Sequence, residues 1–255
     1  MNKLRLTIGY STIAERVTKI NFPKERPQTE ILVAVQGGVA KEPDRADIRM
    51  IHLDTLGAAK SRNVILQEAN SEFVVFGDDD MEWKEDGLTK ILNQFDRNRN
   101  LDLILCQSEN EHKQPRKKYP KQQTRLSKFN SAKAATYEIA IRLSSFREKK
   151  IFFHEDFGAG KKNYIGDEYI FISEACTSGL NCQFIPITIA THPEVSSGMI
   201  YGTLRDSQAR SNVFRAVFGK FAIIARAGFV LKNPLRIGSP VLALRFIFGI
   251  FAKDT

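Results

Sequence analysis

Short runs of aliphatic and β-branched residues alternate with segments of helical apolar spacing over the first 200 positions of the chain. The runs predict β-strands, and apolar residues that recur every three or four positions predict helices. The predicted strands are residues 4–10, 30–35, 73–77, 101–106 and 182–189. The predicted helices are residues 12–20, 55–70, 82–95, 134–146 and 169–178. The polar segment 107–133 is predicted as a mobile loop that can contain an irregular strand, with a solvated linker as the alternative. This alternation predicts an α/β fold, a Rossmann-like three-layer sandwich with a mainly parallel central sheet.

The predicted strand at 73–77 leads directly into three acids, Asp78, Asp79 and Asp80. Carboxylates this close repel one another, so a cation or several hydrogen-bond donors must offset their charge. Mg²⁺ and similar hard cations bind one or two carboxylates and complete their shell with water and phosphate oxygens. Ligands of parallel sheets lie beyond the carboxyl ends of the strands, which is where these acids fall. The pattern predicts a metal site that holds a diphosphate, with a solvated acidic turn at the start of a helix as the alternative.

Four more short motifs accompany these acids. They are residues 57–63 (Gly-Ala-Ala-Lys-Ser-Arg-Asn), 156–160 (Asp-Phe-Gly-Ala-Gly), 166–168 (Gly-Asp-Glu) and His192. Their order and spacing resemble the bacterial family 2 glycosyltransferases with a GT-A fold, over about residues 3 to 200. The resemblance implies an inverting, metal-dependent enzyme that transfers a sugar from a nucleotide-diphosphate sugar to a hydroxyl of a glycan or lipid-linked glycan acceptor. Cell-surface polysaccharide synthesis, such as that of a capsule, is the implied setting.

In the family that the chain resembles, a divalent cation offsets the charge of the departing diphosphate. The resemblance therefore implies that Asp80 binds Mg²⁺ or Mn²⁺ directly, with Asp78 assisting. His192 would complete the metal shell or contact a phosphate, and a buried or capping histidine is the alternative. The implied donor-binding residues are Tyr10, Ser11, Gln36, Lys60, Arg62, Asp78 and Asp79.

A nucleotide-sugar is the implied donor, and a UDP-sugar is the expected one. The resemblance assigns Asp79 to the ribose or to the water shell of the metal. Lys60 and Arg62 lie near the start of a predicted helix and would steer the diphosphate, unless they simply form an exposed basic helix face. Many relatives carry acids that bind the nucleobase where this chain has Gln36, which would pair with a base edge instead.

The acceptor hydroxyl must lose a proton as it attacks, and a carboxylate on the face opposite the leaving group takes that proton, which gives inversion. The resemblance implies that this base belongs to the Gly-Asp-Glu motif, as either Glu168 or Asp167, and the sequence leaves the choice open. Acids that stabilise a helix dipole are the alternative. The implied acceptor-binding residues are Trp83, Phe157, Gly158 and Gly160.

The composition fits a folded cytosolic protein. Hydrophobic residues make up 42% of the 255 positions, which is enough for a sizeable core and excludes disorder of the whole chain. The first 20 residues lack the pattern of a signal peptide. The three cysteines lack the spacing of metal ligands, so a reducing cytosol is the expected environment.

Positive charge is concentrated near the C-terminus. Residues 207–253 contain eight Lys or Arg and no acid, whereas the preceding residues carry 30 bases and 28 acids. Phenylalanines separated by cations predict amphipathic helices on an anionic membrane surface, because no apolar run reaches the roughly 20 residues of a membrane span. The sequence predicts a catalytic domain at 1–202 and a basic helical tail at 203–255, attached to the inner face of the cell membrane. A second core layer is the alternative, and a nucleic-acid partner is not expected.

Two other functions stay open at this point. A nucleotidyltransferase acting on sugar phosphates also holds phosphates with acids and a metal, but it would carry a glycine-rich loop after its first strand, where this chain has only Gly9. A noncatalytic membrane-binding protein would explain the tail. It would leave the acids at 78–80 and 167–168 without a role.

Overall fold

The structure is a computed structural model that describes residues 3–193 and 201–251. Its strands are β1 (Leu6–Ile13), β2 (Thr29–Gln36), β3 (Ile48–Leu53), β4 (Phe73–Gly77), β5 (Glu82–Trp83), β6 (Leu103–Glu109), β7 (Thr124–Arg125), β8 (Ile139–Arg142) and β9 (Cys182–Thr191). Its α-helices are α1 (Ala58–Glu68), α2 (Glu85–Arg97), α3 (Leu143–Lys149), α4 (Asp167–Thr177), α5 (Leu204–Phe218), α6 (Ala222–Lys232) and α7 (Pro240–Phe248). Shorter 3₁₀ helices lie at Ala14–Lys19, Thr136–Glu138, Gly219–Phe221 and Pro234–Arg236.

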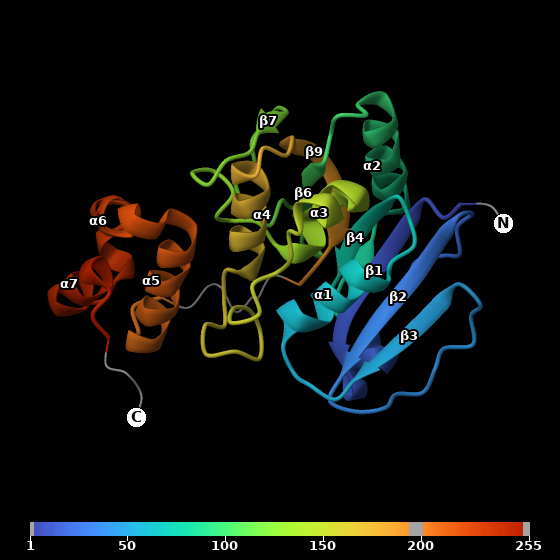
Figure 1. Cartoon of the computed structure of the whole chain (residues 1–255), viewed down its shortest axis with the longest axis horizontal. Coiled ribbons are helices and arrows are strands. Elements are labelled where there is room, and N and C mark those ends of the chain that lie inside the picture. The colour runs from blue at the N-terminus through green and yellow to red at the C-terminus, as the bar shows by residue number, and fades with distance from the viewer. Residues whose placement is uncertain (1–2, 194–200, 252–255) are drawn as a thin grey trace.

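The strands form one nine-stranded sheet in the order β3-β2-β1-β4-β8-β6-β9-β5, with β7 paired to β9. Strands β1 to β4 pair in parallel, as do β6 and β9, whereas β8 runs antiparallel to both of its neighbours. One apolar cluster lies on the α2 face of the sheet and a second lies on the face covered by α1, α3 and α4 (Figure 1). The predicted α/β fold with a mostly parallel central sheet is confirmed.

The prediction of a helix at 134–146 is wrong. This segment contains a 3₁₀ turn, strand β8 and the start of α3. Residues 139–141 are buried on both faces of the sheet and pair with β4 on one side and β6 on the other. Their strand conformation is set by partners far away in the sequence, which outweigh local helix propensity. Strand β3 was not predicted, and residues 82–83, predicted as helix, form β5.

The segment at 107–133 is tied to the body of the protein, contrary to the predicted mobile loop. Strand β6 continues to Glu109, and β7 pairs with β9. The buried carboxylate of Glu138 accepts hydrogen bonds from the hydroxyls of Ser108 at 2.8 Å and Tyr119 at 2.5 Å and from the ammonium of Lys117 at 2.8 Å. A buried carboxylate needs such partners to offset its lost hydration. The segment is therefore anchored at several points.

The basic tail forms three helices, α5 to α7, which we call the tail helices. They lie at one end of the molecule, with α4 between them and the sheet (Figure 1). Val213 of α5 packs in a small apolar cluster with Phe157, Tyr169 and Ile170. The buried guanidinium of Arg226 donates to the carbonyls of Ser211 and Ile247 and so links α6 to α5 and α7. The alternative of a second core layer thus applies to α5.

Among the described residues, no helix has both the length and the apolar content that crossing a membrane requires. Lys253, the last of the predicted tail cations, lies outside the described residues.

Candidate active site

Strand β4 ends at the centre of the sheet and delivers Asp78, Asp79 and Asp80 to its carboxyl edge. The backbone passes close to two aromatic rings at Gly77. A Cβ atom at Gly77 would lie 2.7 Å from Cε1 of Tyr10 and 3.1 Å from Cζ2 of Trp83. Because Gly77 has no side chain, the backbone can pass close to these two rings where β4 leads into the three acids.

Strand β9 ends beside these acids and brings His192 into contact with them. The Nε2 atom of His192 lies 3.2 Å from Oδ1 of Asp80 and 4.0 Å from Oδ2 of Asp78. One ligand atom from each of the three residues falls within 4.8 Å of the others. The structure therefore brings together the three residues that the sequence predicted as metal ligands.

The donor set of this cluster fits a divalent cation. The Nδ1 atom of His192 lies 2.9 Å from the carbonyl oxygen of Pro193, and its ring stacks on Tyr137 with a centroid separation of 4.5 Å. A histidine that donates its Nδ1 proton to a carbonyl presents the Nε2 lone pair to a metal in a fixed orientation. Two carboxylates suit Mn²⁺ and Mg²⁺ when phosphate oxygens supply further ligands, and an imidazole nitrogen is a ligand typical of transition-metal ions.

The two carboxylates differ in their electrostatic environment. Burial raises the pKa of Asp78, with Arg62 and His192 opposing the shift. The hydrogen bond with His192 lowers the pKa of Asp80, which is 45% exposed. The same bond, against the effect of burial, raises the pKa of His192. An ionised Asp80 next to a protonatable histidine is an arrangement in which a divalent cation can replace the proton between them.

Asp79 faces away from this cluster. Its Oδ1 lies 2.5 Å from Nη2 of Arg16, and its Oδ2 accepts a hydrogen bond of 2.5 Å from the hydroxyl of Thr12. Its side chain is buried. These contacts hold the loop after β4 against the end of β1. The ribose contact expected for Asp79 would have to form alongside them.

Helix α4 begins with the second pair of acids, Asp167 and Glu168, after Gly166. A Cβ atom at Gly166 would lie 2.5 Å from Cγ2 of Val213, so α5 packs directly against the start of this helix. Asp167 is buried, and its carboxyl group lies against Gly158, where a Cβ atom would be 2.7 Å from Cγ of Asp167. Gly158 has a φ of +93°, which favours glycine.

Glu168 has the properties of a proton acceptor. Burial raises its pKa well above the usual range, and the neighbouring Asp167 carboxyl group raises it further through repulsion and a hydrogen bond. A carboxylate with a raised pKa holds a transferred proton better than an ordinary one, which general base catalysis requires. The Asp167 carboxyl group is held by its ion pair with Arg62, which leaves Glu168 as the candidate base.

A single guanidinium joins the two acid pairs. Nη1 of Arg62 lies 2.5 Å from Oδ2 of Asp167, and Nη2 lies 3.5 Å from Oδ1 of Asp78. Arg62 projects from α1, is 11% exposed, and lies over the ring of Phe153. The attraction of these acids outweighs burial and raises its pKa. The sequence had assigned Arg62 to the diphosphate; its place between the carboxylates makes it a positioning group for both pairs.

Three other predicted donor-binding residues lie at the ends of β1, β2 and α1. The amide nitrogen of Gln36 donates to Oγ of Ser11 at 3.2 Å, and its carbonyl oxygen accepts from the backbone N–H of Gly57 at 2.6 Å. Ser11 also bonds Ser61 at 2.5 Å. Lys60 is half-buried on the first turn of α1. Gln36 is thus already bonded through both ends of its amide.

Three aromatic residues are not brought into the open site. Tyr10 is fully buried, and its hydroxyl accepts a hydrogen bond of 2.7 Å from Nε1 of Trp83, which is 9% exposed. Phe157 is 6% exposed and packs against α5. The expected donor contact of Tyr10 and acceptor contacts of Trp83 and Phe157 do not fit this burial. All three complete apolar packing beneath the site.

The loop at 156–160 docks on the start of α1. The backbone N–H of Ala58 donates to the carbonyl oxygen of Ala159 at 3.1 Å, and a Cβ atom at Gly160 would lie 3.5 Å from Gly57. Gly158 and Gly160 both have positive φ. The glycines therefore bring the loop close to α1 and Asp167, and any acceptor contact would come from their backbone.

Sequence reasoning missed Arg16, Thr12 and Tyr137, which hold Asp79 and His192 in place. Arg16 lies in the 3₁₀ turn that follows β1, and nothing in its local pattern pointed to the acids 60 positions away. Tyr137 lies in the segment wrongly predicted as helix. A cavity of about 400 Å³ opens beside Asp80 and His192 and is lined further by Lys84, Glu109 and Lys113, among others.

Known proteins resemble this chain both in sequence and in fold. The profile described as "Glycosyl transferase family 2" matches residues 29–157, which is half of the chain. A search of curated protein sequences found no match.

Several solved structures share the fold. A fragment of S. aureus TarS, residues 1–349, in complex with UDP superposes with a TM-score of 0.60 at 16% identity, covering 87% of this chain and 66% of the fragment. The same fragment with UDP-GlcNAc gives a TM-score of 0.60 at 15% identity, covering 85% and 67%. The mannosyltransferase PcManGT from Pyrobaculum calidifontis, in complex with GDP-Man and Mn²⁺, gives 0.59 at 15% identity, covering 99% and 77%. The chain thus spans about two thirds of the TarS fragment, and identity this low establishes a common fold only.

Proposed function

Because this chain belongs to glycosyl transferase family 2 and is therefore a glycosyltransferase, we propose that it transfers a sugar from a nucleotide-diphosphate sugar to a hydroxyl group with inversion at the anomeric carbon. The observation that carries this proposal is the bridge formed by Arg62. Its guanidinium lies 2.5 Å from Asp167 and 3.5 Å from Asp78. This guanidinium therefore joins the metal-type cluster to the start of α4, the helix that carries the candidate base.

The residues divide the work as follows. Asp78, Asp80 and His192 would hold Mg²⁺ or Mn²⁺, which when bound neutralises the charge that develops on a departing diphosphate. Glu168 accepts the proton of the acceptor hydroxyl, and its raised pKa suits this step. Asp167 would keep the Glu168 carboxyl group in place through the hydrogen bond between the two, and Arg62 would hold Asp167. The acceptor hydroxyl would attack the anomeric carbon on the face opposite the departing nucleoside diphosphate, so the configuration at this carbon would be inverted.

The donor is testable directly. UDP-GlcNAc and GDP-mannose are the first candidates, because solved structures with this fold hold UDP-GlcNAc or GDP-Man. With one of them and Mn²⁺, we expect the full chain to release nucleoside diphosphate, measured by a coupled assay. Excess EDTA should reduce the rate at least 10²-fold, and added Mn²⁺ should restore it. Equal rates with and without EDTA would rule out the metal-dependent mechanism.

The tail helices support a place for this reaction at a membrane surface. Large apolar side chains on α6, α7 and their flanks point into solvent, among them Ile224 at 71%, Leu231 at 83% and Leu235 at 96% exposure. Exposed cations, including Lys232 and Arg245, lie between them. Apolar side chains that enter the acyl boundary and cations that meet anionic headgroups are the features of interfacial helices. We therefore propose a peripheral position on the inner face of the membrane, with a glycan or lipid-linked glycan of cell-surface polysaccharide as acceptor.

Vesicle sedimentation tests this position with point variants, because deleting the tail would also remove the support that α5 gives to Gly166. The double variant Leu231→Glu, Leu235→Glu should bind vesicles of 30% phosphatidylserine about 10²-fold more weakly, because each leucine loses a burial free energy of about 1.5–3 kcal/mol. The matched control is Arg97→Glu on α2, which changes the net charge by the same amount. If both proteins sediment like wild type, the tail does not bind membranes.

A further inference from the structure

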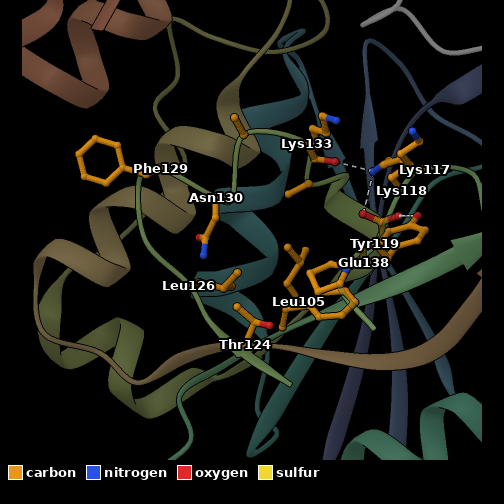
Figure 2. A pocket seen from close by; sticks show the side chains of 14 residues that line it. Leu105, Lys117, Lys118, Tyr119, Thr124, Leu126, Phe129, Asn130, Lys133 and Glu138 are labelled. Atoms are coloured by element: carbon orange, nitrogen blue, oxygen red, sulfur yellow. Dashed lines mark hydrogen bonds and ion pairs between the residues drawn. The ribbon is translucent and has the colours of Figure 1, made fainter. Parts of the chain in front are cut away.

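A second cavity, of about 450 Å³, lies under the segment 117–134 and has no assigned role (Figure 2). Strands β6, β7 and β9 form its floor, and the metal-type cluster is not part of its wall. Its lining residues come from the floor strands and the overlying segment. Those that matter here are Leu105, Leu126, Phe184, Lys117, Lys118 and Lys133. A volume of this size lies within the range of small-molecule sites in proteins.

The floor of the cavity is apolar. Leu105, Leu126 and Phe184 are each less than 8% exposed, and the ring of Tyr119 stacks on Phe184 with a centroid separation of 6.1 Å. Figure 2 shows Leu105, Leu126 and Thr124 close together, below the lysines and Phe129 in this view. Water gains little from such walls, since they offer few hydrogen-bond partners. An alkyl chain is the group that they fit.

The rim of the cavity is positive. Lys117 pairs with the buried Glu138 at 2.8 Å and donates to the backbone carbonyl of Lys133 at 2.7 Å (Figure 2). Among the described residues Glu138 is the only acid in the lining, and its ion pair with Lys117 offsets its charge. Lys118 and Lys133 are exposed, and neither ammonium forms an ion pair with any residue in the described part of the chain. The two cations can bind an anion, and the apolar floor can bind an apolar chain attached to that anion.

Residues in and beside the wall of the cavity contact both the tail helices and the helix that carries the candidate base. Phe129 in its lining packs against Phe218 of α5 with a centroid separation of 5.7 Å, and the ammonium of Lys128 lies 5.3 Å from the same ring. On the other side, the hydroxyl of Tyr169, the residue after Glu168, donates to the carbonyl oxygen of Lys128. The wall of the cavity is therefore linked to α5 of the tail helices and to α4, which carries the candidate base.

We propose that this cavity binds a phosphate-bearing lipid, the membrane-derived end of the acceptor, with its phosphate at Lys118 and Lys133 and its chain over Leu105, Leu126 and Phe184. The statement that this lipid is part of the acceptor rests on the proposed function. The proposal adds the ligand class and the site. The tail helices bring the protein to the membrane, and the cavity takes the lipid phosphate from it.

Binding of farnesyl diphosphate to the full chain tests the proposal, measured by calorimetry in EDTA and without donor. Neither metal nor nucleotide-sugar is present, so the outcome does not depend on whether the chain transfers a sugar. We expect saturable binding, about tenfold weaker in the double variant Lys118→Glu, Lys133→Glu because two favourable charge pairs are lost and two repulsive ones gained. Lys121→Glu reverses one charge in the same segment but outside the lining, and this control should bind like wild type.

The apolar half has its own test, because Phe129 is 78% exposed and its replacement leaves the core intact. Phe129→Ala should weaken farnesyl diphosphate about fivefold and leave inorganic pyrophosphate unaffected. Absence of binding, or binding that the lysine variant does not weaken, overturns the proposal. If farnesol binds as tightly as farnesyl diphosphate, the lysines do not bind the diphosphate and the proposed anion site is wrong. If inorganic pyrophosphate binds as tightly as farnesyl diphosphate, the apolar walls do not bind the chain and the proposed lipid ligand is wrong.

Discussion

Replacing Glu168 by glutamine is expected to lower the rate of sugar transfer about 10³-fold while donor binding stays within twofold of wild type. General base catalysis contributes roughly 10² to 10⁴ in rate, and glutamine keeps the shape of the side chain but cannot accept the proton. The rate is measured with saturating donor and acceptor, and binding by calorimetry. A loss confined to the Michaelis constant of the donor would place Glu168 in binding and remove it as the base.

The same variant is expected to be more stable than wild type at neutral pH. The pKa of Glu168 is raised in the folded state above its unfolded value, so the folded state binds the proton more tightly. Stability therefore falls as the pH rises from the unfolded pKa to the folded pKa, and the full cost is present above the folded one. Glutamine carries no such cost. We expect a higher Tm than that of wild type at pH 8, with a difference that vanishes near pH 4, measured by thermal unfolding across this pH range.

Two control variants distinguish a role as the base from a role in positioning it. Glu174→Gln makes the same chemical change at an exposed residue of the same helix, and this variant should retain full activity. Asp167→Asn breaks the ion pair with Arg62, and should reduce activity through the position of Glu168. If Asp167→Asn loses all activity while Glu168→Gln keeps it, the two acids exchange roles.

Replacing Asp80 by asparagine is expected to lower the rate about 10³-fold and to remove the dependence on Mn²⁺. Asp80 is 45% exposed, ionised, and 3.2 Å from His192, so it is the carboxylate best placed to bind a cation. Loss of one preorganised charge at a developing diphosphate costs several kcal/mol in the transition state. The measurement is the rate as a function of Mn²⁺ concentration.

The control for this variant is Asp86→Asn, the same chemical change at an exposed residue of α2 that pairs with Lys90. It should leave the rate and its metal dependence unchanged. An Asp80→Asn enzyme that still saturates with Mn²⁺ at the wild-type concentration would show that the cation binds elsewhere.

Strands β1, β2, β4, β6 and β9 were predictable because each is a run of mainly apolar residues, such as residues 73–77 and 182–189. The exception at 134–146 has a physical cause. Residues 139–141 form a strand only because β4 and β6 flank it, and no local pattern encodes those partners. The same non-local pairing explains why β3, at the open edge of the sheet, was missed.

The candidate site was predictable in its parts and not in its connections. Carboxylates at the end of a buried strand and at the start of a helix stand out in the sequence, and so do Asp80 and Glu168. The contact between Arg62 and Asp167 spans 105 positions, and only the fold brings them together. The direction of an aromatic side chain is equally invisible in a sequence, which is why Tyr10 and Trp83 were assigned to ligands although they pack beneath the site.

The central claim is that Asp78, Asp80 and His192 hold a divalent cation that also binds the donor diphosphate. Pulsed electron paramagnetic resonance of Mn²⁺ bound to the full chain with UDP tests this most directly. We predict a ¹⁴N coupling from the imidazole of His192 that disappears in His192→Gln, together with a ³¹P coupling from the diphosphate in both proteins. Bound Mn²⁺ that shows no ³¹P coupling, or a ¹⁴N coupling that survives in His192→Gln, would contradict the account.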